Sequence, residues 1–228
     1  MSLLDIIYPK ICLGCGKLGT YCCSHCLESM PKLPYLKCPE CERPAIDGKT
    51  HPRCQKQFGI DGVISLYPYA GIVKKAIKGI KYRFAFRIIE DLFRVIPEEQ
   101  LLLLKNIGSK KNICFIPIPL HASRQRLRGF NQAEIIANTF SKIVFIPTQT
   151  DVLERIQKTP PQVEMKHRQD RIQNMKQVFS VKKNNIEICG FSIFLVDDVY
   201  TTGSTMKSAA EVLKRAGAHF VFGITIAQ

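Results

Sequence analysis

Residues 193–205 read IFLVDDVYTTGST, and this stretch decides the fold. Its four apolar residues, 193–196, predict a strand in the centre of a sheet, and the hydroxyl-rich run 201–205 opens the next helix. Ligands of open α/β sheets bind outside the carboxyl ends of the strands, and a helix N-terminus offers N–H groups to a phosphate. Asp197 and Asp198 would repel an anion unless they face hydroxyl groups, so the stretch predicts a ribose phosphate. The alternative is an ordinary strand–turn–helix with an Asp or Thr cap, but capping does not explain two acids followed by four hydroxyl residues.

The sequence around this stretch alternates between strand-like and helix-like segments. Helix-period apolar residues run through 71–96, and segment 155–178 is polar, basic and typical of a long mobile loop followed by a helical turn. Alternating strands and helices predict an α/β fold with a parallel sheet and helices on both faces. We expect strands at 63–69, 113–120, 143–153, 192–196 and 220–227, and helices at 131–143 and 204–216.

Eight of the ten cysteines lie within the first 54 residues, and seven of them, together with His51, form pairs with C-x2-C or H-x2-C spacing. This spacing places soft ligands around a structural zinc ion. His51 could instead be an ordinary loop histidine, so the pattern leaves one or two zinc ions open, and Cys22 remains as a buried or free thiol. The expected ligands are Cys12, Cys15, Cys23 and Cys26 for the first site, and Cys38, Cys41, His51 and Cys54 for the second.

The cysteine-rich segment also defines the domain organisation. Residues 1–57 are too few, and too rich in Pro and Cys, to bury a sufficient core alone, and zinc would supply the missing folding energy. We therefore expect a zinc-ribbon-like module at 1–57 and the α/β domain at 58–228.

The chain carries 33 Lys and Arg against 19 Asp and Glu, a formal net charge of +14. Such a surplus favours a phosphate-rich partner, which could be a nucleotide, a nucleic acid or an anionic lipid. The apolar runs are far shorter than the roughly 18 residues that span a bilayer, and the N-terminus does not read as a signal peptide. We therefore expect a cytoplasmic protein without a transmembrane segment.

Six basic residues and no acid lie between Asp61 and Glu90. Positive charge interleaved with aromatic residues is typical of surfaces that bind single-stranded nucleic acid. The alternative is that the lysines are merely exposed and the aromatic residues belong to the core. The candidate nucleic-acid contacts are Lys74, Lys78, Lys81 and Arg83, and the interleaved aromatic residues are Tyr67, Tyr69, Tyr82, Phe84 and Phe86.

These motifs resemble two known groups of proteins. Residues 193–205 are similar to the phosphoribosyl-pyrophosphate (PRPP) signature of type I phosphoribosyltransferases, with Tyr200 where many members have a small aliphatic residue. Over nearly its whole length the chain resembles the ComF family of competence-associated proteins, in which a zinc module precedes a phosphoribosyltransferase-like domain. That family usually has a cysteine at the position of His51. Further stretches that carry the resemblance are Pro117–Pro119 with Arg128–Gln132, Lys158–Gln162 with Arg168, Arg171, Asn174 and Phe179, and Tyr67–Tyr69 with the basic helix after it.

The resemblance implies a role for each matching residue. Asp197 and Asp198 would hold the ribose hydroxyls and are the catalytic candidates, with Mg²⁺ bridging the pyrophosphate and ribose oxygens. The turn after Pro119 would contact the pyrophosphate, because the fork of an arginine suits a pair of phosphate oxygens; the alternative is that its arginines form a solvated turn. The implied 5′-phosphate ligands are Thr201, Thr202, Gly203, Ser204 and Thr205, and the implied pyrophosphate ligands are Arg124, Arg126 and Arg128.

The resemblance also implies a function. It points to a competence protein that acts in the uptake and handling of single-stranded DNA during natural transformation, together with proteins of the DNA-uptake machinery, and that binds PRPP or a related ribose phosphate. Two alternatives stay open at this point, because a fold does not supply a reaction. One is an active phosphoribosyltransferase of nucleotide salvage, and the other is a regulator that senses PRPP without transferring anything.

Overall fold

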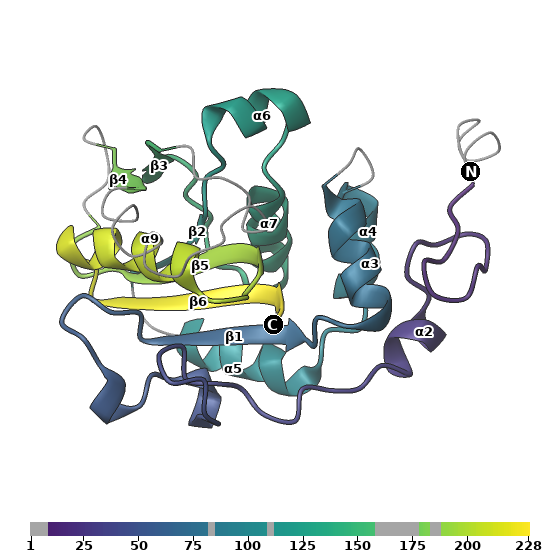
Figure 1. The fold of residues 1–228 in the computed structure, drawn as a ribbon, viewed down its shortest axis with the longest axis horizontal. Coiled ribbons are helices and arrows are strands. Elements are labelled where there is room, and N and C mark those ends of the chain that lie inside the picture. Colours follow the sequence, from purple (N-terminus) through teal and green to yellow (C-terminus); the bar gives the residue numbers. More distant parts are fainter. Residues whose placement is uncertain (1–8, 82–84, 109–111, 158–177, 183–187) are drawn as a thin grey trace, which may run out of the picture.

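The centre of the molecule is a four-stranded parallel sheet, seen in a computed structural model that describes residues 9–81, 85–108, 112–157, 178–182 and 188–228 (Figure 1). The strands lie in the order β1-β6-β5-β2, and all neighbouring pairs run parallel. The sheet confirms the predicted α/β class and puts β5, with the acid pair at its end, inside the sheet. The strands are β1 Gly62–Tyr67, β2 Ile113–Pro117, β5 Ser192–Val199 and β6 Phe220–Ala227.

The side chains of β5 alternate between two apolar cores. Phe194 and Val196 lie in the core on one face of the sheet, and Ile193 and Leu195 lie in the core on the other. All four are fully buried. Because helices cover both faces, the strand has no polar side, and its sequence is therefore a continuous apolar run instead of an alternating one.

Four helices pack on one face of the sheet, and one helix with a small antiparallel strand pair packs on the other (Figure 1). Phe115 of β2 stacks between Phe194 and Phe140, at ring-centroid distances of 5.3 and 5.9 Å, and so anchors the first core. Helices on both faces agree with the prediction. The first group is α3 Gly71–Ile80, α4 Ala85–Phe93, α5 Glu98–Gly108 and α7 Gln132–Val144; the second is α9 Ser204–Arg215 with β3 Leu153–Arg155 and β4 Phe179–Val181.

The prediction of a strand at 143–153 was wrong. Helix α7 continues to Val144 and ends at Phe145, whose left-handed φ of 58° stops it. Beyond it, Thr148 makes one isolated bridge to Phe115, and a regular strand begins only at Leu153. Pro147 lacks the N–H group that a longer ladder needs.

The other predicted helices and strands differ less from those in the structure. The helical pattern at 71–96 is divided between α3 and α4, and α5 was not expected from the sequence. The strand at 113–120 ends at Pro117, and the expected turn after Pro119 contains the helix α6 (Ala122–Arg128). Residues 158–177 of the expected mobile loop lie outside the described residues.

In its described residues, from 9 onward, the cysteine-rich segment before β1 has short helical elements, and two of its contacts with the α/β domain lie at separate places. The hydroxyl of Thr20 donates to Asp91 of α4 at 2.7 Å. At the other place, the hydroxyl of Tyr200 donates to the carbonyl of Pro39 at 3.1 Å. The short elements are α2 Ser24–Glu28, η1 Ile46–Gly48 and η2 Pro52–Cys54.

Candidate functional site

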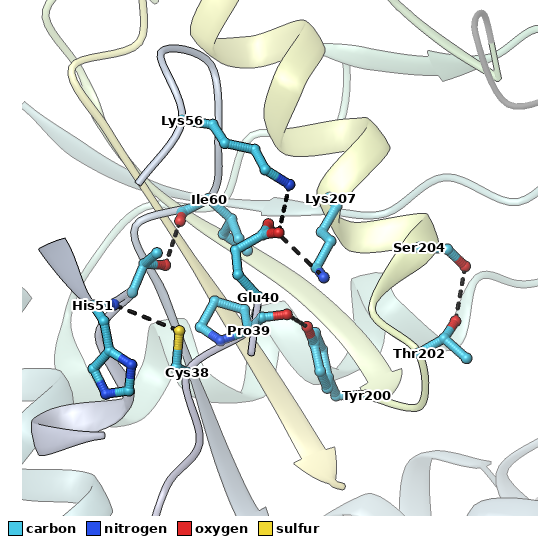
Figure 2. A network of polar contacts seen from close by, with 11 residues as sticks. Cys38, Pro39, Glu40, His51, Lys56, Ile60, Tyr200, Thr202, Ser204 and Lys207 are labelled. Atoms are coloured by element: carbon cyan, nitrogen blue, oxygen red, sulfur yellow. Dashed lines mark hydrogen bonds and ion pairs between the residues drawn. The ribbon is translucent and has the colours of Figure 1, made fainter. Parts of the chain in front are cut away.

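The phosphate-type loop lies where the sequence places it, between the carboxyl end of β5 and helix α9. Gly203 precedes the helix in the left-handed conformation, with φ of 69°, and in this described part of the chain no side chain caps α9. The hydroxyls of Thr202 and Ser204 face each other at 3.0 Å (Figure 2). A helix N-terminus whose hydroxyls lie beside it, without a capping side chain, can donate hydrogen bonds to an anion.

The acid pair lies at the end of β5, next to this loop. The N–H group of Asp198 donates to Oδ1 of Asp197 at 2.8 Å. Burial, followed by the charge of Asp198, raises the pKa of Asp197 well above its ordinary value, although that hydrogen bond and Arg155 oppose the shift. In the free chain Asp197 therefore holds a proton more tightly than an ordinary Asp, and a cation would favour the ionised form.

Arg128 and Arg155 interact electrostatically with the two acids, and Arg124 lies near both arginines. Burial lowers the pKa of Arg128, whereas Asp198 raises it and Arg124 lowers it. Burial likewise lowers the pKa of Arg155 at the end of β3, with Arg124 lowering it further and Asp197 raising it. Arg128 of α6 and Arg155 of β3 therefore each lie within electrostatic range of one of the acids, and Arg124 lies within range of both arginines.

Arg155 was not among the residues expected from the sequence. It belongs to a strand of three residues, and the sequence signal was weak, because it reads as one more basic residue in segment 155–178. Among the expected residues, Arg126 is exposed on α6. Asn131 caps α7 by accepting from the N–H of Ala133 at 3.1 Å.

The first expected metal site is assembled in the structure. The ligand atoms of its four cysteines lie within 4.8 Å of one another. Sγ of Cys23 is 3.6 Å from that of Cys12 and 3.7 Å from that of Cys15. Zn–S bonds of about 2.3 Å in a tetrahedron give sulfur–sulfur edges of about 3.8 Å, so this tetrad fits zinc. Cys26 completes it.

The second tetrad is also assembled, with His51 among its members. Nδ1 of His51 lies 3.3 Å from Sγ of Cys41, and Nε2 lies 3.0 Å from the carbonyl oxygen of Pro44. A proton on Nε2 that is donated to Pro44 leaves Nδ1 with its lone pair toward the metal position. Metal-ligating histidines use their second nitrogen in this way, and the geometry therefore favours a ligand over a loop histidine.

The C-x2-C turns of the two tetrads have the same backbone geometry. Gly16 and Glu42, each directly after the second cysteine of its turn, have left-handed φ values of 79° and 61°. Their N–H groups donate to the carbonyls of Cys12 and Cys38 at 3.0 and 2.9 Å. Glu42 adopts a conformation that glycine adopts more easily, because the turn requires it.

Hydrogen bonds from backbone N–H groups lower the pKa of one thiol in each tetrad, which favours the thiolate form. Burial opposes ionisation of Cys12, but N–H groups of Cys23, Cys15 and Gly14 lower its pKa to about 6. Burial also opposes ionisation of Cys38, whose pKa is lowered to about 7 in the same way. Thiolates are the form that binds zinc.

Cys22 lies outside both tetrads. It is buried, and burial followed by the charge of Asp91 raises the pKa of its thiol to about 12. Its N–H group donates to Asp91 at 3.2 Å. Cys22 is thus a core thiol of the module.

The expected basic surface is assembled in part. Lys74 and Lys78 are exposed on α3 and Lys81 at its C-cap, and Lys74 lies over the ring of Tyr69 at 5.7 Å. Tyr67 is buried and donates its hydroxyl to the carbonyls of Leu92 and Val95, so it is a core residue and does not contribute to the surface. Arg83, Tyr82 and Phe84 lie outside the described residues.

Among the residues that the structure describes, none of the helices combines the length and the apolar character that crossing a bilayer requires.

Comparison with known proteins agrees with this geometry. Residues 128–227 match the phosphoribosyl transferase domain family. The chain is 29% identical over 197 residues to competence protein F of Haemophilus influenzae, covering 86% of this chain and 85% of that protein. It is 26% identical over 205 residues to competence protein ComFC of Bacillus subtilis, covering 86% and 78%. It is 28% identical over 220 residues to the DNA utilization protein YhgH of Escherichia coli K12, covering 92% and 93%.

The matched family spans the loop, α9 and the arginine at 128, and the relatives extend over the cysteine-rich segment as well. The chain is therefore a homologue of the ComF- and YhgH-type proteins, with a phosphoribosyl transferase domain behind an N-terminal module whose cysteine clusters fit zinc.

Proposed function

We propose that this chain is a ComF-type competence protein that handles single-stranded DNA during natural transformation and binds PRPP or a related ribose 5-phosphate at its 197–205 loop. The observation that supports this ligand is the juxtaposition of the acid pair, the uncapped start of α9 and the neighbouring arginines. The relatives named for competence and DNA utilization support the biological role.

Each group of the loop has a role in this proposal. The N–H groups at the start of α9 and the hydroxyls of Thr201, Thr202, Ser204 and Thr205 donate to the 5′-phosphate. Asp197 and Asp198 accept hydrogen bonds from the ribose hydroxyls. Mg²⁺ bound together with the pyrophosphate would favour the ionised carboxylates of Asp197 and Asp198. The pyrophosphate contacts are Arg124, Arg128 and Arg155, with Arg126 at the exposed side of α6.

Zinc in both tetrads is part of the proposal, with a structural role. The spacing of the ligand atoms and the hydrogen bond from His51 to Pro44 support it. Each tetrad offers four protein ligands, which is typical of closed structural sites.

The proposal of a DNA-binding surface is supported by positive charge. The exposed lysines of α3 lie on one helix, next to Tyr69, and a backbone-tracking lysine with a neighbouring aromatic ring suits single-stranded nucleic acid. Such binding weakens as the salt concentration rises, because phosphate contacts release counterions.

One specific observation favours a second candidate, an active phosphoribosyltransferase. Arginines beside the acid pair are suited to stabilise the charge that develops on a leaving pyrophosphate. A PRPP sensor would use the same loop for binding alone. Release of pyrophosphate from PRPP in the presence of nucleobases distinguishes the two, since a sensor releases none.

Isothermal titration of PRPP with Mg²⁺ into the zinc-loaded chain tests the ligand. We expect saturable binding that the double variant Asp197→Asn with Asp198→Asn abolishes, and that Asp151→Asn, a change at an exposed carboxylate, leaves intact. No heat with the unaltered chain would reject the ligand.

Binding of a short single-stranded DNA at several salt concentrations tests the surface. We expect Lys78→Glu to weaken binding and to flatten its salt dependence. Lys105→Glu on α5 makes the same charge change at another exposed lysine and serves as the matched control. Equal effects of the two changes would argue for non-specific attraction to the net charge. A transformation assay with the aspartate double variant then tests whether the ligand matters to DNA uptake.

A further inference from the structure

The second tetrad lies against the phosphate-type loop. Pro39 and Glu40 are the two residues between Cys38 and Cys41. Pro39 contacts Tyr200, directly after β5, and Glu40 contacts Lys207 in the first turn of α9 (Figure 2). The carbonyl of Pro39 accepts the hydroxyl of Tyr200 at 3.1 Å. The two contacts join residues 161 and 167 positions apart in the sequence, and no motif in either segment predicts them.

Tyr200 in turn fixes the loop. Its ring lies directly against Gly203, so that a Cβ at position 203 would fall 2.1 Å from the phenol oxygen and 2.4 Å from Cζ. Its N–H group donates to the carbonyl of Ala227 at the end of β6 at 2.8 Å. The side chain of Tyr200 is therefore held between the Pro39 carbonyl and the backbone of the anion loop.

Glu40 provides the second connection. Its carboxylate lies 3.8 Å from Nζ of Lys207, in the first turn of α9, and accepts from Nζ of Lys56 at 2.5 Å (Figure 2). The Glu40 side chain is only 14% exposed, so solvent screens this pair less than a fully exposed one. Glu40 thereby links the metal turn to the helix whose N-terminus faces the ligand.

The conformation of the turn depends on its cysteines. The N–H group of His51 points to Sγ of Cys38 at 3.5 Å, and that of Glu42 donates to the Cys38 carbonyl at 2.9 Å. A metal ion bound by Cys38 and Cys41 would hold both ends of the turn, and with them the Pro39 carbonyl and the Glu40 carboxylate.

We propose that the Cys38–Cys41 turn supports the anion site, and that Tyr200 is the positioning residue that connects this turn to the 201–205 loop. Metal binding at the second tetrad holds Tyr200 and Lys207 in place and so pre-organises the 201–205 loop. By linkage, a ligand on the loop strengthens metal binding at the second tetrad by the same factor. The inference rests on the proposed ligand, a ribose phosphate.

Tyr200→Phe is the sharpest test, because it removes the hydroxyl donor and keeps the ring on Gly203. We expect it to weaken binding of PRPP with Mg²⁺ to the zinc-loaded chain by about 3- to 10-fold, the range for one lost hydrogen bond. The matched control is Tyr35→Phe, the same change at an exposed tyrosine close to the tetrad, which should leave the Kd unchanged. Equal Kd values for all three chains would overturn the inference.

Zinc affinity provides a readout that a merely structural role of Tyr200 would not change. Competition with a chromophoric chelator, with and without saturating PRPP and Mg²⁺, measures the affinity of each tetrad. We expect PRPP to tighten zinc at the second tetrad by about fivefold or more in the unaltered chain and in Tyr35→Phe, but clearly less in Tyr200→Phe. The first tetrad, which contacts α4 instead of the loop, should show no change.

Glu40→Gln tests the second connection, with Glu99→Gln at an exposed site of α5 as its control. We expect Glu40→Gln to weaken PRPP binding by about two- to fivefold, because a partly screened ion pair is lost. Two failures are distinguishable. Absence of PRPP binding by the unaltered chain rejects the proposed function together with this inference. Normal PRPP binding without any effect on zinc affinity rejects the inference alone.

Discussion

The ring of Tyr200 packs against Cα of Gly203 and leaves no room for a side chain there. A Cβ at position 203 would lie 2.1 Å from the tyrosine hydroxyl oxygen, far inside van der Waals contact, and the φ of 69° already disfavours any other residue. Gly203 thus meets two independent requirements: a left-handed backbone before α9 and close approach of an aromatic ring.

Gly203→Ala should therefore disrupt the loop. The left-handed backbone alone costs about 1–2 kcal/mol for alanine, and the contact with Tyr200 adds to it. We expect binding of PRPP with Mg²⁺ to fall at least about tenfold, measured by titration calorimetry, because the N–H groups of the loop move. The control is Gly190→Ala, where φ is 77° but a Cβ meets nothing within 4 Å. It should lower the melting temperature slightly and leave PRPP affinity unchanged; a comparable loss of affinity would contradict the explanation.

Asp197→Asn should stabilise the chain in the absence of ligand. Because the pKa of Asp197 is raised in the folded state, its protonated form contributes stability below the ordinary value of 3.8, and this contribution is lost as the pH rises through the raised pKa. The asparagine variant avoids that loss. Above this window we expect its melting temperature to exceed that of the unaltered chain by at least about 2 °C, the effect of about 1 kcal/mol in a chain of this size. Thermal melts at several pH values check it.

The difference between the two chains should shrink as the pH falls toward 3.8. Asp151→Asn, at a carboxylate whose side chain is 81% exposed, provides the comparison and should show no such trend. A pH-independent gain for Asp197→Asn would mean that relief of the buried charge is not its cause.

Asp91 should be essential for docking of the first tetrad. Its buried carboxylate accepts the hydroxyl of Thr20 and the N–H of Tyr21, each at 2.7 Å, and the N–H of Cys22 at 3.2 Å. Asp91→Ala removes this acceptor from three donors, and we expect a loss of about 2–4 kcal/mol in the free energy of unfolding. Urea denaturation measures it. Glu90→Ala, at the exposed neighbouring residue, should change stability by less than about 0.5 kcal/mol. A similar small loss at Asp91 would refute the role of these bonds.

His51→Ala should remove one of two zinc ions. The variant lacks the ligand that faces Cys41, so we expect the zinc content of the purified chain to fall from about two ions to about one, measured by atomic emission. His51→Cys supplies a thiolate at the same position and should restore the second ion. His25→Ala, at an exposed histidine outside both tetrads, is the control. Unchanged zinc content in His51→Ala would make His51 a loop histidine.

Most of the candidate site could be predicted from the sequence, because its residues lie close together in the chain. The four apolar residues of β5, the acids after them and the hydroxyl run that opens α9 are contiguous, so one stretch of chain determines their arrangement. The ligand pairs of the tetrads are readable for the same reason, because a C-x2-C turn brings its two sulfur atoms together by itself. The division of the chain between residues 57 and 58, and the roles of individual loop residues, stay predictions.

Two predictions from the local sequence were wrong, because tertiary packing determined the structure at those places. The apolar residues at 143–146 read as the start of a strand, but α7 packs on β2 and β5 and continues through Val144. Tyr67 reads as part of a basic aromatic surface, yet its hydroxyl finds two carbonyl acceptors inside the core. A sequence pattern does not reveal whether an amphipathic aromatic side chain has a partner inside or outside.

The class of fold, the two groups of potential metal ligands and the composition of the 201–205 loop follow from the sequence, because each depends on residues close together in the chain. The distant residues that pack against them are known only from the tertiary structure. It brought Arg155 beside the acids, Asp91 under the first tetrad, and Pro39 to the hydroxyl of Tyr200. The two contacts of the module link residues 71 and 161 positions apart, and in each a polar group of one part finds its hydrogen-bond partner in the other.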